Sequence, residues 1–572
     1  MRFDLRAIPF SRQGSFFAVS RLPAKDKRPA GLYLRSVRGD ITTPDGEIFR
    51  IDLVRNKKPV KNIRECAAPH LLTLSASVGL ASICFDGIAG VRVAAKGVGL
   101  RLTLVPGAYG TAIPVNNQVW AINNYANKSS YFLRVVSGTA AARIVPAIGH
   151  TSDFTVSLHP AEEGEACECV IEEQCAGIGE LPAQATSFIK ACAATQRSWN
   201  SWLFRTLQTT TELDDARTLG AYINWSAHVG PSGHLTRPVL YMSKNWMNSI
   251  WSWDNCFNAL AHVRSHPHLA WDQLMIFADH QNKNGAYPDS INDKQIGWNF
   301  CKPPVHGWAL SWMMQRSAYC TPERLARIYP SLVAWTNRWF LYRDYDGDGI
   351  PQYNHGNDSG WDNATVFDNG VPVEAPDHPA YLVLQMDTLS EIAGKLGKKG
   401  EARKWTNRAN LLLKKFIVHS WKNNSFMSFK SGDHTCVKSD SLINYMPIVL
   451  GKRLPIYIKK ALLKGLRQKG RFLTDNGFAT ESVKSKHYET DGYWRGPIWA
   501  PSTMLLVDGL YRAGERGFSE EIAGRFCAMA AKNGMAECFD AVSGKGLRDL
   551  SYTWTASVFL VLANEYTGRV KP

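Results

Sequence analysis

The 572-residue chain lacks the features that mark membrane proteins and secreted proteins. It has no uninterrupted apolar run of about 18 residues, so a membrane-spanning helix is not expected. Charged Asp4, Arg6 and Arg12 interrupt the N-terminal segment, where no secretory signal peptide is evident. We therefore expect a cytoplasmic protein with no membrane partner. A leader removed from the sequence would instead indicate a periplasmic or secreted protein.

The twelve cysteines also lack a recognisable metal-binding pattern. Cys167 and Cys169 form a C-x-C pair with Cys175 nearby, but no further Cys or His pair completes a zinc set. Without a leader, free thiols in a reducing compartment are the simplest interpretation.

Acidic residues are outnumbered, since 66 Lys and Arg stand against 50 Asp and Glu, a formal net charge of +16. The basic residues are spread along the chain and form no nucleic-acid-binding motif, so nucleic acid is not expected as a partner. The excess charge favours anionic partners in general. It is compatible with an acidic sugar substrate but does not demonstrate one.

Tryptophan is nearly missing from the first third of the chain, where Trp120 is the single example before residue 190 out of 19 in all. Short β-rich runs separated by glycine-rich turns occupy that part, among them 31–40, 46–54 and 98–110. Their alternating pattern predicts an antiparallel β-sandwich from about residue 10 to 180. We assign residues 1–182 to this N-terminal domain.

The remainder of the chain has helical periodicity. A linker helix is expected within 183–214, and an all-α domain over 215–572. Its predicted helical stretches are 259–282, 305–318, 323–343, 379–396, 400–419, 440–450, 455–468, 499–515, 518–533 and 553–566. Long loops rich in Gly, Asp, Asn and Trp alternate with them, and such loops usually build a functional site.

Candidate catalytic acids lie in two of these loops. Asp358 and Asp362 flank Ser-Gly-Trp in the loop 344–377, and Glu537 lies near the C-terminus in the stretch GMAECFDAV. Cleavage of a glycosidic bond needs two carboxyl groups, one to protonate the leaving oxygen and one to attack the sugar or activate water. Burial beside an aromatic ring such as Trp361 would keep Asp362 protonated. An aspartate in a polar loop is more often a turn former, which suits Asp358.

Several motifs taken together resemble glycoside hydrolase family 63, which includes processing α-glucosidases, bacterial α-glucosidases and mannosylglycerate hydrolases. They are WSWDNCFNA (251–259), GAYPDS (285–290), RDYDGDGIPQY (343–353), NDSGWDN (357–363), YWRGPIW (493–499), AECFDAVSGKG (536–546) and SYTWTA (551–556). The resemblance covers roughly 215–572 and implies an (α/α)6 barrel that hydrolyses with inversion. It also implies Asp362 as general acid and Glu537 as general base. The substrate-binding positions expected on this basis are Trp253, Asp254, Asp289, Trp361, Trp494, Arg495 and Trp499.

We therefore predict an inverting, exo-acting α-glycosidase, in the first instance an α-glucosidase acting on a small oligosaccharide or glycoside. The substrate is a carbohydrate, and the chemistry needs no cofactor. A glycoside phosphorylase on the same barrel and a glycan-binding protein without activity are the alternatives. Both Asp362 and Glu537 are present, which argues against each of them. Cys538, where relatives often carry another residue, and the unmatched stretch 291–305 leave sugar and linkage open.

A calcium site is a further expectation for the run Asp344-Tyr-Asp-Gly-Asp-Gly-Ile350. Carboxylates of Asp344, Asp346 and Asp348 and the carbonyl of Ile350 copy the first half of an EF-hand loop. His355 occupies position twelve, so a remote acid such as Glu374 would have to complete the shell. The alternative, that these acids only cap backbone N–H groups of a turn, stays open.

Overall fold

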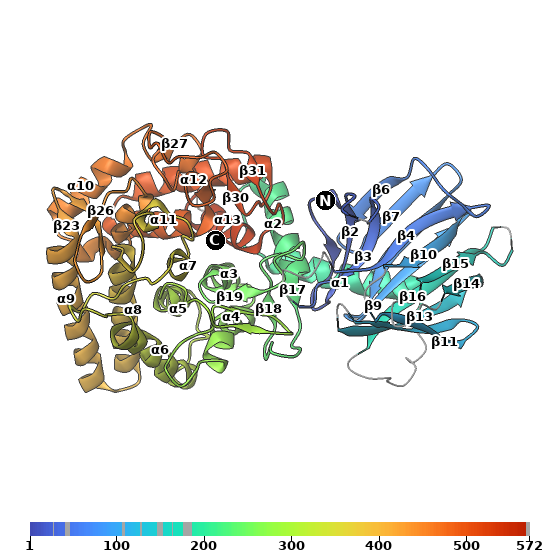
Figure 1. The fold of residues 1–572 in the computed structure, drawn as a ribbon, viewed down its shortest axis with the longest axis horizontal. Coiled ribbons are helices and arrows are strands. Elements are labelled where there is room, and N and C mark those ends of the chain that lie inside the picture. Colours follow the sequence, from blue (N-terminus) through green and yellow to red (C-terminus); the bar gives the residue numbers. More distant parts are fainter. Residues whose placement is uncertain are drawn as a thin grey trace.

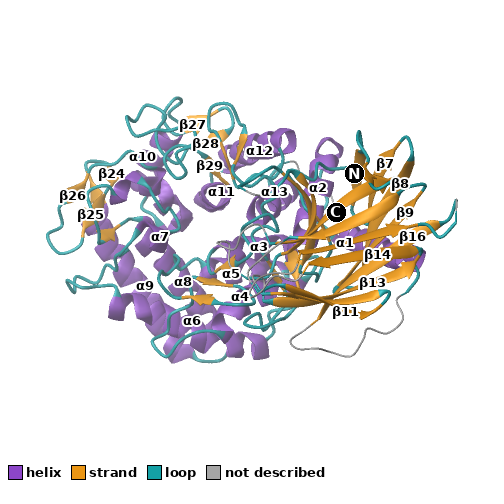
Figure 2. Cartoon of the chain, turned by 45° about the vertical axis from the view of Figure 1, so that its right-hand side comes forward, coloured by secondary structure: helices purple, strands orange, loops and turns teal. Residues whose placement is uncertain are grey.

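The computed structural model describes residues 1–26, 28–39, 46–105, 109–125, 128–145, 153–162, 164–174 and 186–567. They form a β-domain and a helical domain joined by one long helix (Figure 1). Seen from a second side, strands fill one half of the molecule and helices the other (Figure 2). Cys175, the expected end of the sandwich and the expected boundary at 182/183 lie outside the described residues.

The β-domain contains two antiparallel eight-stranded sheets. One has the order β1-β2-β3-β4-β10-β15-β14, with β5 paired to β4, and the other has the order β11-β12-β13-β16-β9-β8-β7-β6. The strands are β1 (Phe10–Ser11), β2 (Phe17–Leu22), β3 (Gly31–Ser36), β4 (Glu47–Arg55), β5 (Lys58–Pro59), β6 (Arg64–Ala68), β7 (Leu71–Ala76), β8 (Gly79–Asp86), β9 (Gly90–Lys96), β10 (Gly99–Leu104), β11 (Thr111–Asn116), β12 (Val119–Asn124), β13 (Ser129–Ser137), β14 (Thr139–Val145), β15 (Asp153–His159) and β16 (Ala166–Gln174).

The two sheets share one apolar core because side chains alternate along each strand. Leu100 and Leu102 of β10 point inward from the first sheet, and Val91 and Val93 of β9 point inward from the second. All four side chains are inaccessible to solvent. The predicted antiparallel β-domain is confirmed.

Helix α1 (Phe188–Arg205) connects the domains. The hydroxyl of Ser187 accepts the Lys190 N–H and caps its first turn. The helix packs on β8 of one domain and on α2 (Asp214–Ala227) of the other. Its buried Trp199 and Trp202 join a small core with Trp225. Residues 183–185 of the expected linker helix lie outside the described part.

The helical domain is a closed ring of paired helices within residues 186–567. The inner members α3, α5, α8, η3, α11 and α13 contact one another in that order, and α13 returns to α3. Inner helices such as α13 are buried on nearly all sides, whereas outer helices such as α9 bury one stripe. This arrangement is the predicted (α/α)6 barrel. Its helices are α2 (Asp214–Ala227), α3 (Asp254–His262), α4 (Pro267–Asp279), α5 (His306–Arg316), α6 (Pro322–Tyr342), α8 (Asp377–Lys395), α9 (Lys399–Ser420), η3 (Leu442–Arg453), α10 (Ile456–Leu466), α11 (Ala500–Ala513), α12 (Arg516–Asn533) and α13 (Thr553–Glu565).

Short elements occupy the connecting loops. These are the one-turn helix α7 (Gly356–Ser359), the 3-10 turns η1 (Thr211–Leu213) and η2 (Thr365–Phe367), and the strands β17 (His228–Val229), β18 (Val239–Leu240), β19 (Ile250–Trp251), β20 (Ser290–Ile291), β21 (Ile296–Gly297), β22 (Val373–Glu374), β23 (Trp421–Lys422), β24 (Ser425–Phe426), β25 (Ser428–Lys430), β26 (Cys436–Val437), β27 (Leu473–Thr474), β28 (Gly477–Phe478), β29 (Ile498–Trp499), β30 (Cys538–Phe539) and β31 (Gly546–Leu547).

Three helical elements differ from the sequence-based expectation. The stretch 259–282 is two helices, because the residue before Pro267 is disfavoured in the α region and His266 takes φ −143° and ψ 65°. The stretch 440–450 is the 3-10 element η3, in which Pro447 lacks an N–H and Gly451 has φ 54°. Helix α2 was not expected.

The described cysteines are all free thiols. Cys167 and Cys169 lie on the inward face of β16 within the apolar core. None of the described helices combines the length and the apolar composition that a membrane crossing needs.

Candidate active site

A cavity of about 260 Å³ opens where the inner helices begin. Asp254 is the first residue of α3, Lys302 precedes α5, Asp362 precedes α8, and Trp554 lies in the first turn of α13. The lining residues are Met247, Trp251, Trp253, Asp254, Asp289, Asn299, Phe300, Lys302, Asn357, Gly360, Asp362, Tyr493, Trp494, Tyr552 and Trp554. The volume falls just below the range of about 300–1,000 Å³ usual for small-molecule sites, so it suits a small ligand.

The turn before Asp362 allows the acid to reach the cavity. Helix α7 ends at Ser359 and is capped by Gly360, which has φ 74°. A β-carbon at this position would lie 2.4 Å from the ring of Trp253. The site therefore requires glycine here both for its backbone conformation and for the close approach of Trp253.

Polar groups surround the Asp362 carboxyl. With the Asn357 amide oriented so that both of its ends are satisfied, its nitrogen donates to the two Asp362 oxygens at 2.7 and 2.9 Å. Burial raises the pKa of Asp362 above its ordinary value, while the charge of Lys302 and a hydrogen bond from the Tyr493 hydroxyl oppose this rise. The carboxyl is thus desolvated but surrounded by donors, as expected of a group that exchanges a proton.

The second candidate acid, Glu537, stands just before β30. Its N–H donates to the Asp549 carbonyl at 2.7 Å, and its own carbonyl accepts the Trp554 indole N–H at 3.1 Å. Burial, followed by the charge of Asp549, raises the pKa of Glu537 to about 8. The next residue, Cys538, is buried and pairs with Trp499 across β29 and β30. The side chain that departs from the family pattern is therefore packed inside the protein.

Glu537 is not itself a lining residue of the 260 Å³ cavity, but it lies next to the cavity's wall. Tyr493 and Tyr552 both line the cavity, and the charge of Glu537 raises the pKa of each hydroxyl after burial, the larger cause. Asp362 also raises the pKa of Glu537. The two acids therefore interact electrostatically, and both act on the hydroxyl of Tyr493.

Tryptophans form one wall of the cavity. Trp253 and Trp494 line it, with ring centroids 6.0 Å apart. Trp499 stacks behind Trp494 at 4.2 Å, and the fully buried Trp361 contacts Trp494 at 4.8 Å. Trp361 and Trp499 thus support the wall from behind rather than facing the cavity.

Three aspartates and one lysine define the charge of the cavity. The Lys302 ammonium lies 3.3 Å from Asp289 and donates to the Asn357 carbonyl at 2.8 Å. Burial raises the pKa of Asp254, which the Lys302 charge opposes and the Asp362 charge reinforces. One cation among Asp254, Asp289 and Asp362 leaves the site with a surplus of acceptors for sugar hydroxyls.

Arg495, expected at the substrate, is directed toward the loop after Asp362. Its guanidinium forms an ion pair with Asp368 and donates from Nε to the Asn363 carbonyl at 2.8 Å. It therefore fastens the loop after Asp362 and is not a lining residue. The expected turn-forming role of Asp358 agrees with the structure, since its carboxylate accepts the N–H groups of Cys301 and Asn354.

Sequence reasoning missed several lining residues. Asn357 and Tyr493 stand inside motifs that were recognised, so the motifs themselves carried the signal. Lys302 lies in the unmatched stretch 291–305, where no residue pattern pointed to the site. A lone lysine between Cys301 and two prolines is not by itself a functional signal.

The acids of the expected calcium loop lie outside the cavity. Asp344 Oδ2 accepts the Gly349 N–H at 3.1 Å, and Asp348 Oδ1 accepts the Ile350 N–H at 2.7 Å. These bonds are those of a capped turn. The remaining oxygens of Asp346 and Asp348 face Glu374 and two histidines.

Comparison with known proteins places these features in a family. Residues 247–555 match the model of the mannosylglycerate hydrolase MGH1-like glycoside hydrolase domain. The mannosylglycerate hydrolase of Rubrobacter radiotolerans is 22% identical over 408 residues, covering 54% of this chain and 89% of the relative. That of Thermus thermophilus is 21% identical, covering 54% and 93%.

Solved structures show the same fold. The glycoside hydrolase family 63 mannosylglycerate hydrolase of Thermus thermophilus in complex with glucose superposes with a TM-score of 0.52 at 17% identity, over 60% of this chain and 99% of that one. A bacterial glucoamylase complexed with acarbose gives 0.63 at 10% identity, over 98% and 94%. The latter likeness spans the β-domain as well as the barrel.

Proposed function

The chain belongs to the mannosylglycerate hydrolase MGH1-like family of glycoside hydrolases, and from this premise we propose that it is an inverting, exo-acting α-glycoside hydrolase. Asp362 is the general acid and Glu537 the general base. The observation that carries the proposal is the pair of buried, electrostatically coupled carboxyls beside a tryptophan-walled cavity. An acid and a base of this kind are what hydrolysis of a glycosidic bond requires.

Each residue of the site has a separate role in this proposal. Asp362, held by Asn357 and Tyr493, gives its proton to the leaving oxygen. Glu537, once ionised, takes a proton from the attacking water on the opposite face of the sugar. Trp494 offers a flat face for the sugar ring, and Asp254 and Asp289 accept hydrogen bonds from its hydroxyls.

The size and charge of the cavity favour a small neutral substrate, first of all an α-glucoside. A cavity of about 260 Å³ holds a single sugar unit rather than a chain segment, which supports exo action. With Asp362 protonated, Asp254 and Asp289 still face Lys302, so the cavity offers no net positive charge to a free carboxylate. The mannosylglycerate named for the relatives is therefore the second candidate, favoured by their similarity and not by the charge of the cavity.

The test is a panel of α-glucosides, α-mannosides and α-galactosides given to the full chain, with mannosylglycerate beside the matched neutral mannosylglycerol. Proton NMR should detect the β-anomer as the first product from an α-glycoside. First release of the α-anomer would overturn inversion. Turnover that requires inorganic phosphate would support the phosphorylase alternative, and binding without turnover would support the inactive glycan-binding alternative.

A further inference from the structure

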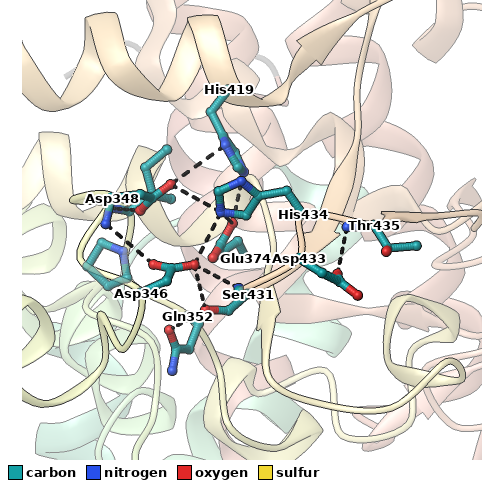
Figure 3. Close-up of polar contacts among 12 residues, drawn as sticks. Asp346, Asp348, Gln352, Glu374, His419, Ser431, Asp433, His434 and Thr435 are labelled. Atoms are coloured by element: carbon teal, nitrogen blue, oxygen red, sulfur yellow. Dashed lines mark hydrogen bonds and ion pairs between the residues drawn. The ribbon is translucent and has the colours of Figure 1, made fainter.

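A cluster of two carboxylates and two imidazoles joins four separate segments outside the cavity (Figure 3). Asp348 lies in the loop after α6, Glu374 in β22, His419 near the end of α9, and His434 between β25 and β26. Each contributes one potential ligand atom, and these atoms all lie within 4.8 Å of one another. The four side chains point toward a common centre in Figure 3.

Glu374 is the unusual member of the cluster. Its side chain is 0% exposed and pairs with the imidazole of His419, whose Nε2 lies 2.9 Å from Oε2. This contact lacks the direction of a good hydrogen bond, so the buried carboxylate is incompletely satisfied. Burying a carboxylate whose donors are poorly directed is unfavourable. A positive charge at this point would remove that cost.

The distances suit a small metal ion. Nε2 of His434 lies 3.7 Å from Asp348 Oδ2 and 3.9 Å from Glu374 Oε2, and Nδ1 of His419 lies 3.7 Å from Asp348 Oδ2. Ligands about 2.0–2.1 Å from a tetrahedral ion stand roughly 3.3 Å apart. The four ligand atoms, which lie within 4.8 Å of one another, would draw together by up to about 1.5 Å to reach that spacing.

Asp346 adds to the negative charge at this site. Its Oδ2 accepts the Gly432 N–H at 2.7 Å and the Ser431 hydroxyl at 3.1 Å, and it lies 3.1 Å from Nε2 of His434. Because these donors hold Asp346 in place, its carboxylate faces the cluster in a defined orientation. Asp346 therefore adjoins the cluster of two acids and two histidines through His434.

We propose that Asp348, Glu374, His419 and His434 bind one divalent transition-metal ion, with zinc as the representative metal. Imidazole nitrogens suit zinc and its neighbours, whereas calcium takes oxygen ligands. Two carboxylates with two neutral imidazoles balance the charge of the ion. The oxygen-only calcium set expected from the sequence shares Asp348 and Glu374 with this site, but the two histidines change the preferred metal.

Four protein ligands make the site a structural one. The ion would tie the loop after α6 and β22 to α9 and to the β25–β26 hairpin. β22 already pairs with β25, and the backbones of Tyr353 and Val373 are hydrogen-bonded to each other. The ion would therefore add to the contacts that hold the segment carrying Asp362. A surface depression of about 630 Å³, lined by Asp348, His419 and His434, gives the ion access from solvent.

The experiment uses the full chain, stripped with a chelator, reloaded with zinc and dialysed. Metal content per chain is measured by mass spectrometry, and affinity by competition with a chromophoric chelator. Cobalt replaces zinc in a parallel sample, since its visible absorption reports tetrahedral nitrogen and oxygen ligation. We expect about one zinc per chain and a rise in melting temperature on binding.

His434→Ala is the main variant, because His434 is 42% exposed and its removal leaves the packing intact. It should weaken zinc affinity at least about tenfold and abolish the cobalt spectrum. Glu374→Gln is the second variant, with the same expectation. His487→Ala, an exposed histidine outside the cluster, is the matched control and should bind zinc like the wild type.

Three results would overturn the proposal. The first is a wild type that retains no zinc, which would leave the cluster as ion pairs between protonated histidines and carboxylates. The second is equal zinc affinity in the wild type and His434→Ala. The third is a melting temperature raised by calcium but not by zinc, with His434→Ala unaffected, which would support the oxygen-only set instead.

Discussion

Trp494 lies face to face on Trp499, with ring centroids 4.2 Å apart and planes 6° from parallel. Trp494 faces the cavity, while the indole N–H of Trp499 is held by the Tyr493 carbonyl at 2.8 Å. Trp499 also pairs with Cys538, the residue after Glu537. The aromatic wall is therefore two rings thick, and its rear layer is joined to the strand beside the proposed base.

Trp499→Phe should impair catalysis although Trp499 does not line the cavity. The smaller ring leaves Trp494 unsupported and removes the bond to Tyr493, at a cost of about 1–3 kcal/mol by analogy with other large-to-small core changes. We expect a lower melting temperature and kcat/KM reduced about tenfold or more. Trp421→Phe, in the outer hairpin, is the control. Unchanged kinetics in Trp499→Phe would show that the second layer has no catalytic role.

Asp362→Asn and Glu537→Gln should each reduce turnover at least about 100-fold while the fold persists. Each change keeps the shape of the side chain but removes the group that transfers a proton. Circular dichroism and melting curves verify folding, and Asp475→Asn, on a fully exposed acid, is the matched control. A variant of either acid that keeps a tenth of wild-type turnover would refute the assignment.

The acidic limb of the pH profile of kcat/KM should lie at an unusually high pH. Glu537 must be ionised to act as base, and burial raises its pKa to about 8, so activity rises with pH up to that region. The charge of Asp549 is the second cause of the rise, so Asp549→Asn should move this limb to lower pH. Asp475→Asn, on a fully exposed acid, should leave the limb in place. A wild-type limb near pH 4–5 would contradict the prediction.

Gly360→Ala should disrupt the site, because the new methyl group would meet the Trp253 ring at 2.4 Å and φ is 74°. Displacing Trp253 or the turn before Asp362 by about 1 Å is expected to cost about 100-fold in turnover. Gly394→Ala in α8 is the matched control, since its β-carbon would meet open space. That variant should be as active as the wild type and slightly more stable.

Lys302→Met should shift the alkaline limb of the pH profile of kcat/KM to higher pH. Lys302 lowers the pKa of Asp362, so removing its charge leaves the proton on this acid to higher pH. The change also leaves Asp289 without its partner at 3.3 Å, and KM should rise. Lys486→Met, on an exposed lysine, serves as the control. An unmoved alkaline limb in Lys302→Met would exclude this electrostatic role.

The sequence predicted more of the fold than of the site. Strand alternation and helical periodicity are local signals, so both domains could be identified from them. The break between α3 and α4 at His266 depends on one proline, and the longer apolar pattern of residues 259–282 concealed it. The closed ring depends on contacts between α13 and α3, which no local pattern encodes, and it was expected only from the resemblance.

Within the site, motifs located residues but not the directions of their side chains. Asp254, Trp253 and Trp494 line the cavity with Asp362 as expected. Arg495 belongs to the same motif as Trp494, yet Asp368 binds its guanidinium away from the cavity. Lys302 was missed because its partners Asp289 and Asn357 are distant in sequence and meet it only in the folded barrel.

The closure of the ring between α13 and α3 has a consequence for synthesis on the ribosome. Asp362 is translated well before Glu537, and the helix that seals the barrel emerges after both. During translation the inner faces of α3, α5 and α8 are therefore uncovered on one side, and the two acids cannot yet meet. Until α13 docks, the ring is open between α11 and α3.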